Sequence, residues 1–107
     1  MIDVMSELDA VKGKTAEALR AAEADSGASV VLVAVVREFD SKADKANRVS
    51  DGDGAARDAV IELEQAGDSA KAAAEADTGA GARTRELVLD AHLAICRLKA
   101  TGSTTGD

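Results

Sequence analysis

The apolar residues of this chain recur at helical spacing along four segments, about 3–24, 28–49, 54–76 and 82–100. Within each segment they follow i, i+3, i+4 and i+7 steps, which bring side chains to one face of a helix. The four stripes are Val4, Leu8, Val11, Leu19 and Ala22; Leu32, Val35, Val36, Phe39, Ala43, Ala46 and Val49; Ala56, Ala59, Val60, Leu63, Ala66 and Ala70; and Leu87, Val88, Ala91, Ala94, Ile95 and Leu98. The pattern predicts four amphipathic helices.

The segment 28–49 begins with SVVLVAVVREF, in which seven apolar residues follow one another. Such a β-branched run is also typical of a buried strand. The apolar stripe continues beyond the run in helical register, however, and no second segment resembles a partner strand. We therefore expect a helix that is buried nearly all round at its start. Whether 28–49 and 54–76 form one long helix, broken at Gly52–Gly54, stays open.

Glycine and aspartate gather at 25–29, 50–55 and 77–82, where they predict turns and helix caps. Two of these places carry nearly the same phrase, AAEADSGA at 21–28 and AAEADTGA at 73–80. Each copy is expected to end one helix and to cap the next one with its Asp–Ser/Thr–Gly. The repeat favours two tandem helical hairpins with similar corners. A duplication would explain it, and so would the convergence of alanine-rich helices.

The composition is that of an all-α protein with a thin core. Proline is absent, Phe39 is the only aromatic residue, and alanine is abundant. Because apolar burial contributes about 25 cal/mol per Å², small alanine side chains add little, and we expect modest stability or support from a partner. The predicted fold is an antiparallel bundle of four helices in one domain, 1–100, with a disordered polar tail, 101–107. Gly67 with Asp68 is expected to bend or loosen the third helix.

The charge, the cysteine content and the absence of long apolar runs exclude several classes. A net charge of −7 does not attract phosphate backbones, so no nucleic-acid binding is expected. No run approaches the roughly 18–20 apolar residues of a membrane span. The N-terminus MIDVMSELDA shows no cleaved secretory signal, and Cys96 stands alone, which excludes an intramolecular disulfide. A cytoplasmic location fits these features, as does export without a cleaved signal peptide.

The stretch DGDGAARDAVIE at 51–62 is the best metal candidate in the sequence. It places Asp51, Asp53 and Glu62 at positions 1, 3 and 12 of a calcium-binding loop. Positions 5 and 6 are both alanine, where the loop needs an oxygen ligand and a glycine. A helix-capping turn is therefore the better interpretation.

His92 and Cys96 share a helix face through their i, i+4 spacing. Together with Asp90 or Glu86 they would be candidates for zinc binding, or for a base and a nucleophile. No further cysteine or histidine completes a structural zinc site, and no oxyanion hole is evident. We expect Cys96 to be a small core residue and His92 a boundary residue.

Glu62, Glu64 and Asp68 form a carboxylate cluster on the third predicted helix. Glu62 and Glu64 point to different faces, and acid–base catalysis needs groups that converge from separate elements. A solvated face is the better interpretation. We therefore predict no catalytic, cofactor-binding or metal-binding residue and no enzyme activity; an enzyme that uses His92 and Cys96 is the least favoured alternative.

Residues 1–76 resemble the short helical hairpins of the actinobacterial WXG100/EspC-like family, which is associated with type VII secretion. These are alanine-rich, acidic chains of about this size with a glycine-containing turn, here SGAS at 26–29, and a signature near the end of the second helix, here ELEQAGDSAKAAAEA at 62–76. No tryptophan precedes the turn, and Glu64 stands in place of the tyrosine, so Asp68 alone remains of the export signature. The resemblance implies a non-enzymatic, secreted or secretion-associated helical protein that works as a dimer.

These features favour a non-enzymatic, acidic helical interaction protein without a cofactor. Its partner, another protein or a second copy, would bind the valine-rich segment 28–49 or the locally basic, leucine-rich segment 82–100. The alternative is a cytoplasmic regulator or inhibitor, such as an immunity, antitoxin-like or phage accessory protein, whose acidic surface covers a basic partner. The identity of the partner and the oligomeric state stay open.

Overall fold

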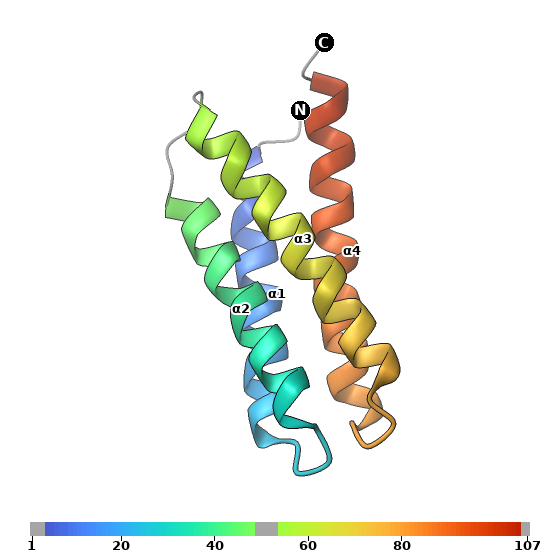
Figure 1. Ribbon diagram of the computed structural model, residues 1–107. Helices are drawn as coiled ribbons and strands as arrows, with labels where there is room; N and C mark the ends of the chain where they lie inside the picture. Colours follow the sequence, from blue (N-terminus) through green and yellow to red (C-terminus); the bar gives the residue numbers. More distant parts are fainter. Residues whose placement is uncertain (1–3, 49–53, 106–107) are drawn as a thin grey trace.

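The computed structural model describes residues 4–48 and 54–105, which form four α-helices: α1 (Val4–Ala24), α2 (Val30–Arg48), α3 (Gly54–Ala76) and α4 (Ala82–Thr105). Each helix packs against two neighbours, α1 and α3 each lying against both α2 and α4. The turns 25–29 and 77–81 lie at the same end of the bundle (Figure 1). Successive helices are antiparallel, so the predicted four-helix bundle is confirmed and α2 and α3 are separate helices.

The valine-rich run forms the start of α2 and not a strand. The Oγ of Ser29, the residue before the helix, accepts a hydrogen bond from the backbone N–H of Leu32 at 3.0 Å, which is an N-cap. The expectation that this start is buried nearly all round is wrong, because Val30 is 86% and Val31 66% exposed. Only one face of α2 meets α1 and α3, and these two valines lie outside that face.

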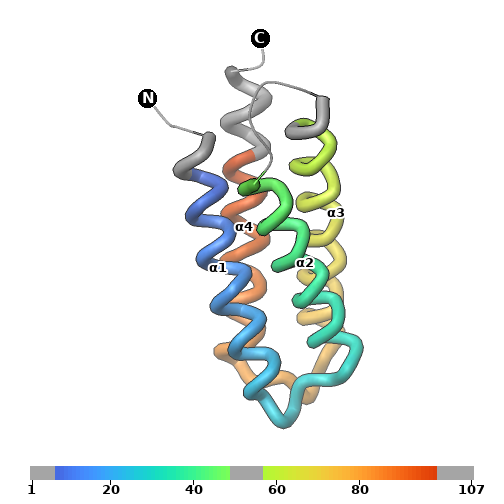
Figure 2. Tube along the Cα trace, turned by 90° about the vertical axis from the view of Figure 1, so that its left-hand side faces the viewer, coloured from blue at the N-terminus to red at the C-terminus, as the bar shows by residue number. Residues whose placement is uncertain are grey.

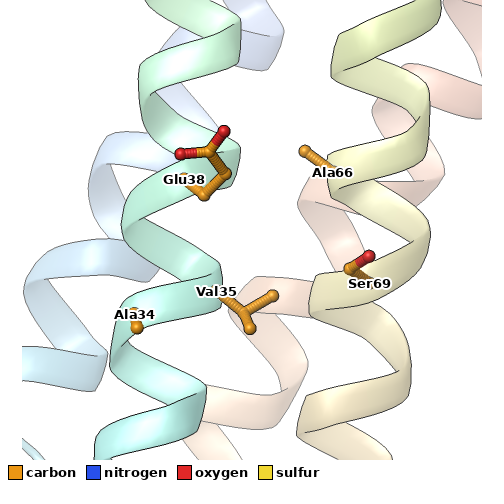
Figure 3. Close-up of a pocket in the computed structure, with 5 residues that line it drawn as sticks. All are labelled: Ala34, Val35, Glu38, Ala66 and Ser69. Atoms are coloured by element: carbon orange, nitrogen blue, oxygen red, sulfur yellow. The ribbon is translucent and has the colours of Figure 1, made fainter.

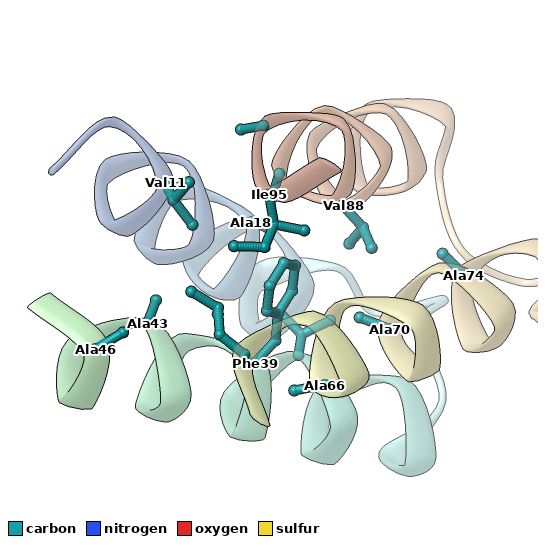
Figure 4. Packing of buried hydrophobic residues seen from close by; sticks show 14 of the residues in the cluster. Val11, Ala18, Phe39, Ala43, Ala46, Ala66, Ala70, Ala74, Val88 and Ile95 are labelled. Atoms are coloured by element: carbon teal, nitrogen blue, oxygen red, sulfur yellow. The ribbon is translucent and has the colours of Figure 1, made fainter. Parts of the chain in front are cut away.

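The core follows the four predicted stripes. Every stripe residue whose exposure is described is buried or half-buried, and Val49 lies outside the described residues. Many of the buried positions are alanines that let the helices approach closely, among them Ala18, Ala43, Ala59, Ala70, Ala74 and Ala91 (Figure 4). The larger side chains Val11, Leu32, Val36, Leu63, Val88 and Ile95 fill the remaining space between the helices.

The ring of Phe39 lies within this core, and a glycine on a neighbouring helix leaves the space that it occupies. Phe39 on α2 is fully buried and points toward Ile95 of α4 (Figure 4). A Cβ added to Gly67 of α3 would lie 3.2 Å from both Cε1 and Cζ of that ring and 3.4 Å from Cγ2 of Ile95. Gly67 is itself buried inside an uninterrupted helix. Gly67 does not interrupt α3, and its missing side chain makes room for the ring.

The two halves of the chain bury residues in the same register. Positions 52 residues apart are both buried all along α2 and α4, namely Leu32 and Thr84, Val36 and Val88, Phe39 and Ala91, Ala43 and Ile95, and Ala46 and Leu98. At some of these corresponding positions one half carries a large buried residue and the other half a small one, as with Phe39 and Ala91. This shared register favours the interpretation of two related hairpins, α1–α2 and α3–α4.

The repeated phrase brings the two turns into direct backbone contact. A Cβ added to Gly27 would overlap with the carbonyl oxygen of Gly79, and a Cβ on Gly79 would lie 2.6 Å from the carbonyl oxygen of Gly27. Figure 2 shows these two turns side by side at the end of the bundle. Both glycines are required for the same reason, because any side chain would force the turns apart.

The aspartates of the repeated phrase cap helices crosswise. Asp25 accepts hydrogen bonds from the backbone N–H of Gly81 at 2.7 Å and from the Thr84 hydroxyl at 2.8 Å, both at the start of α4. Asp77 accepts one from the backbone N–H of Ser29 at 2.8 Å, at the start of α2. The prediction that each phrase caps its own following helix is thus wrong for the aspartates, because the turns lie so close that each carboxylate reaches the other hairpin.

These hydrogen bonds also set the ionisation of the two carboxylates. The N–H of Gly81, followed by the hydroxyl of Thr84, lowers the pKa of Asp25, and the N–H of Ser29 lowers the pKa of Asp77. A negative charge at the positive end of a helix is favourable. Each hairpin therefore supplies an ionised cap to the other.

The fourth helix is longer than the sequence pattern indicates. α4 continues to Thr105, so its predicted end at residue 100 is wrong, and residues 101–105 of the predicted disordered tail are helical. Extending an existing helix needs no new nucleation, and no proline stops it here. Residues 106–107 lie outside the described part. None of the helices described is long and apolar enough to cross a bilayer.

Candidate functional site

His92 and Cys96 meet a carboxylate, but not the expected one. The Nε2 of His92 on α4 lies 2.9 Å from Oδ1 of Asp68 on α3, and neither Asp90 nor Glu86 is part of the contact. The sequence did not show this pairing because it depends on how α3 and α4 align. Cys96 is exposed, so the prediction that it is a core residue is wrong, whereas the His92 side chain, 16% exposed, lies at the boundary as predicted.

The sulfur of Cys96 is not aligned with either ring nitrogen of His92. It lies 3.8 Å from both Nδ1 and Nε2. In a nucleophile–base pair one nitrogen faces the sulfur and the other faces the carboxylate, so the sulfur would lie much closer to one of them. Among the residues the structure describes, no group of three or more His, Cys, Asp or Glu side chains could hold a metal ion. The contact between His92 and Asp68 therefore links α3 to α4, and Cys96 does not have the geometry of a nucleophile beside it.

The candidate calcium loop is only partly within the described residues. Asp51 and Asp53 lie outside them, and Glu62 on α3 accepts charge-assisted hydrogen bonds from Lys42 at 3.1 Å and Lys45 at 3.2 Å. The hydrogen bonds and charges of the two lysines lower the pKa of Glu62, and Glu62 in turn raises the pKa of Lys42. Glu62 thus links α3 to α2 through two ammonium groups.

A polar cluster that sequence reasoning missed lies between α1 and α2. The hydroxyl of Thr15, which is fully buried, lies 2.8 Å from Oδ1 of Asp40, and Nζ of Lys12 lies 2.9 Å from the same oxygen. Lys12 and Thr15 are three residues apart and so share a face of α1, which is the only trace of the cluster in the sequence. Its groups satisfy one another, so it fixes the register of the first hairpin.

An apolar surface along the seam of α2 and α3 is open to solvent. A cavity of about 260 Å³, open to solvent, is lined by Ala34, Val35 and Glu38 of α2 and by Ala66 and Ser69 of α3 (Figure 3). Val31 precedes Val35 by four residues and therefore lies one turn before it on α2. Residues 29–36 carry no charge in a chain of which 31% is charged. This α2–α3 surface, defined by Val30, Val31 and the cavity, is the candidate binding site.

No family model matches the chain, and no curated protein and no solved structure matches it.

Proposed function

We propose that the protein is a non-enzymatic helical interaction protein that binds through the α2–α3 surface. The observation that carries the proposal is the exposure of Val30 and Val31, 86% and 66%, at the start of α2. Burying a valine side chain completely is worth about 1.5–3 kcal/mol. Two adjacent valines in water beside an apolar cavity therefore favour association with another apolar surface.

The kind of partner follows from the shape and charge of the surface. An open apolar cavity between two helices suits the apolar face of a third helix. The first partner to test is a second copy of the chain, because residues 29–36 are uncharged and therefore place no like charges opposite each other where two copies meet. An association with secretion, implied by the WXG100/EspC-like resemblance, stays a prediction.

The alternative function, an inhibitor whose acidic surface covers a basic partner, has less support. Glu17, Glu23, Asp40, Glu62 and Glu75 each contact a lysine or an arginine of the same chain. A carboxylate that is already paired contributes less to the attraction of a basic partner.

Sedimentation and light scattering over a range of protein concentrations test the proposal. We expect the unmodified protein to self-associate as its concentration rises, and the double variant Val30→Asp/Val31→Asp to stay monomeric. Aspartate in the first turn of a helix is favourable, so α2 itself is preserved. Ala10→Asp, a substitution at an exposed position of α1, is the matched control and should associate like the unmodified protein. Equal behaviour of all three proteins would contradict the proposal.

A further inference from the structure

The surface between the two hairpins combines the kinds of contact that are found in protein–protein interfaces. Hairpin 1 is α1–α2 and hairpin 2 is α3–α4, and they meet where α2 packs on α3 and α1 on α4. Glu62 of hairpin 2 pairs with Lys42 and Lys45 of hairpin 1, and Arg83 approaches Glu17 at 3.8 Å. Apolar, charged and hydrogen-bonded contacts therefore all cross this one surface.

Each hairpin lacks groups that only the other hairpin supplies. The N–H of Ser29 in hairpin 1 donates to Asp77 of hairpin 2, and the N–H of Gly81 in hairpin 2 donates to Asp25 of hairpin 1. The ring of Phe39 likewise packs on Gly67 of the other hairpin. A hairpin alone would expose its apolar stripe and leave these groups to water.

The packing at Gly67 disfavours a pair of two first hairpins. In the register shared by the two halves, Thr15 of hairpin 1 corresponds to Gly67 of hairpin 2, and both are buried. Two first hairpins would therefore bring Thr15 toward the ring of Phe39, where even a single added Cβ lies 3.2 Å from the ring carbons. The steric conflict disfavours the pairing of two first hairpins, and a clash with the wrong partner makes a surface more specific.

We propose that this surface is a specific recognition surface for a second copy of the chain, so that hairpin 1 of one copy binds hairpin 2 of another through the contacts present within one chain. In the intact chain the hairpin in the same molecule has the advantage, because a short linker gives an effective concentration on the order of millimolar. Pairing between two copies becomes detectable when one hairpin of each copy is unable to fold, because the competing hairpin of the same chain is then removed.

Two full-length variants test the pairing. Copy A carries Val11→Asp and Val36→Asp, which disable hairpin 1. Copy B carries Leu63→Asp and Val88→Asp at the corresponding positions of hairpin 2. All four side chains are fully buried, so a charge at any of them opposes folding of its hairpin.

Far-ultraviolet circular dichroism and light scattering give the readout. Each copy alone should show little helix. An equimolar mixture should recover about half of the unmodified signal per chain and form a 1:1 complex of two chains, since one hairpin of each copy is then folded. Association through the α2–α3 surface of the proposed function cannot produce this gain, because it supplies no core.

A matched pair of glycine substitutions tests the specificity. Gly67→Val in copy A should abolish the gain in helix, whereas Gly13→Val in copy B should leave it, since nothing lies within 4 Å of a Cβ at Gly13. A mixture whose signal is only the average of its two components would overturn the proposal. Recovery that is equally insensitive to both glycine substitutions would overturn the assigned specificity.

Discussion

Two glycines inside helices differ sharply in what surrounds them, and the same substitution at both measures the packing of the core. Gly13 on α1 is exposed, and an added Cβ would meet nothing within 4 Å. Gly67 on α3 is buried, and an added Cβ would lie 3.2 Å from two ring carbons of Phe39. The pair Gly13→Ala and Gly67→Ala therefore shares one change in helix propensity and differs in packing alone.

The expected free energies follow from these two terms. Alanine is about 1 kcal/mol more favourable than glycine inside a helix, so Gly13→Ala should raise the free energy of unfolding by about 1 kcal/mol. An extra carbon in a well-packed core typically costs about 1–3 kcal/mol. Because the ring of Phe39 is fully buried and the added Cβ would also lie 3.4 Å from Ile95, Gly67→Ala should lower the free energy of unfolding by up to about 2 kcal/mol.

Urea unfolding followed by circular dichroism measures both variants, with the denaturant slope as a check that the compactness of the states is unchanged. In a domain of this size, 1 kcal/mol corresponds to a shift in Tm of about 4–8 °C, which is readily resolved. Phe39→Leu combined with Gly67→Ala should cost less than the sum of the two single changes, because the smaller side chain relieves the contact. If Gly67→Ala stabilised the protein as much as Gly13→Ala does, the assigned packing of Phe39 on Gly67 would be refuted.

Three further predictions concern the core, the turns and the thiol. Phe39→Ala should cost about 3–5 kcal/mol, a large part of the stability of a small domain, and thermal unfolding will show it. Because hydrogen bonds lower the pKa of Asp25 and Asp77, their stabilisation is fully present above the ordinary aspartate pKa of about 3.9 and is lost as the pH falls through the lower, folded-state value. The contribution of the two aspartates to the urea midpoint should therefore be lost as the pH falls below about 4, and the fall in this range should be smaller in Asp25→Asn/Asp77→Asn. Cys96 is exposed, so a thiol reagent should modify it completely in the native protein without changing the helical signal, and protection until unfolding would contradict the position of its side chain.

The helices and the core were predictable because they depend on local periodicity. Stripes at a spacing of 3.6 residues identify a buried face wherever the helix packs, and the four predicted segments correspond to α1–α4. The exposure of residues at the start of a helix was not predictable, because a run of valines does not show whether a neighbouring helix covers it. Val30 and Val31 could therefore not be assigned to the surface from the sequence.

The contacts across the bundle were the part that sequence reasoning missed. An Asp–Ser/Thr–Gly stretch has the pattern of a local turn, and nothing in it shows that Asp25 reaches the start of α4. Asp68 and His92 likewise come together only because α3 and α4 align in one register. The repetition of the phrase was the one available signal, since a crosswise pair of caps needs an aspartate and a glycine in both turns.

Amide chemical shifts in solution show whether each turn caps a helix of the other hairpin. Asp77→Asn should shift the amide proton of Ser29, and Asp25→Asn should shift that of Gly81, because each carboxylate accepts a hydrogen bond from the other hairpin. An acid titration should show the same pairing, with each amide following the carboxylate across the turn. If Ser29 instead responded to Asp25→Asn and Gly81 to Asp77→Asn, or if neither amide responded, the arrangement of the two hairpins would be contradicted.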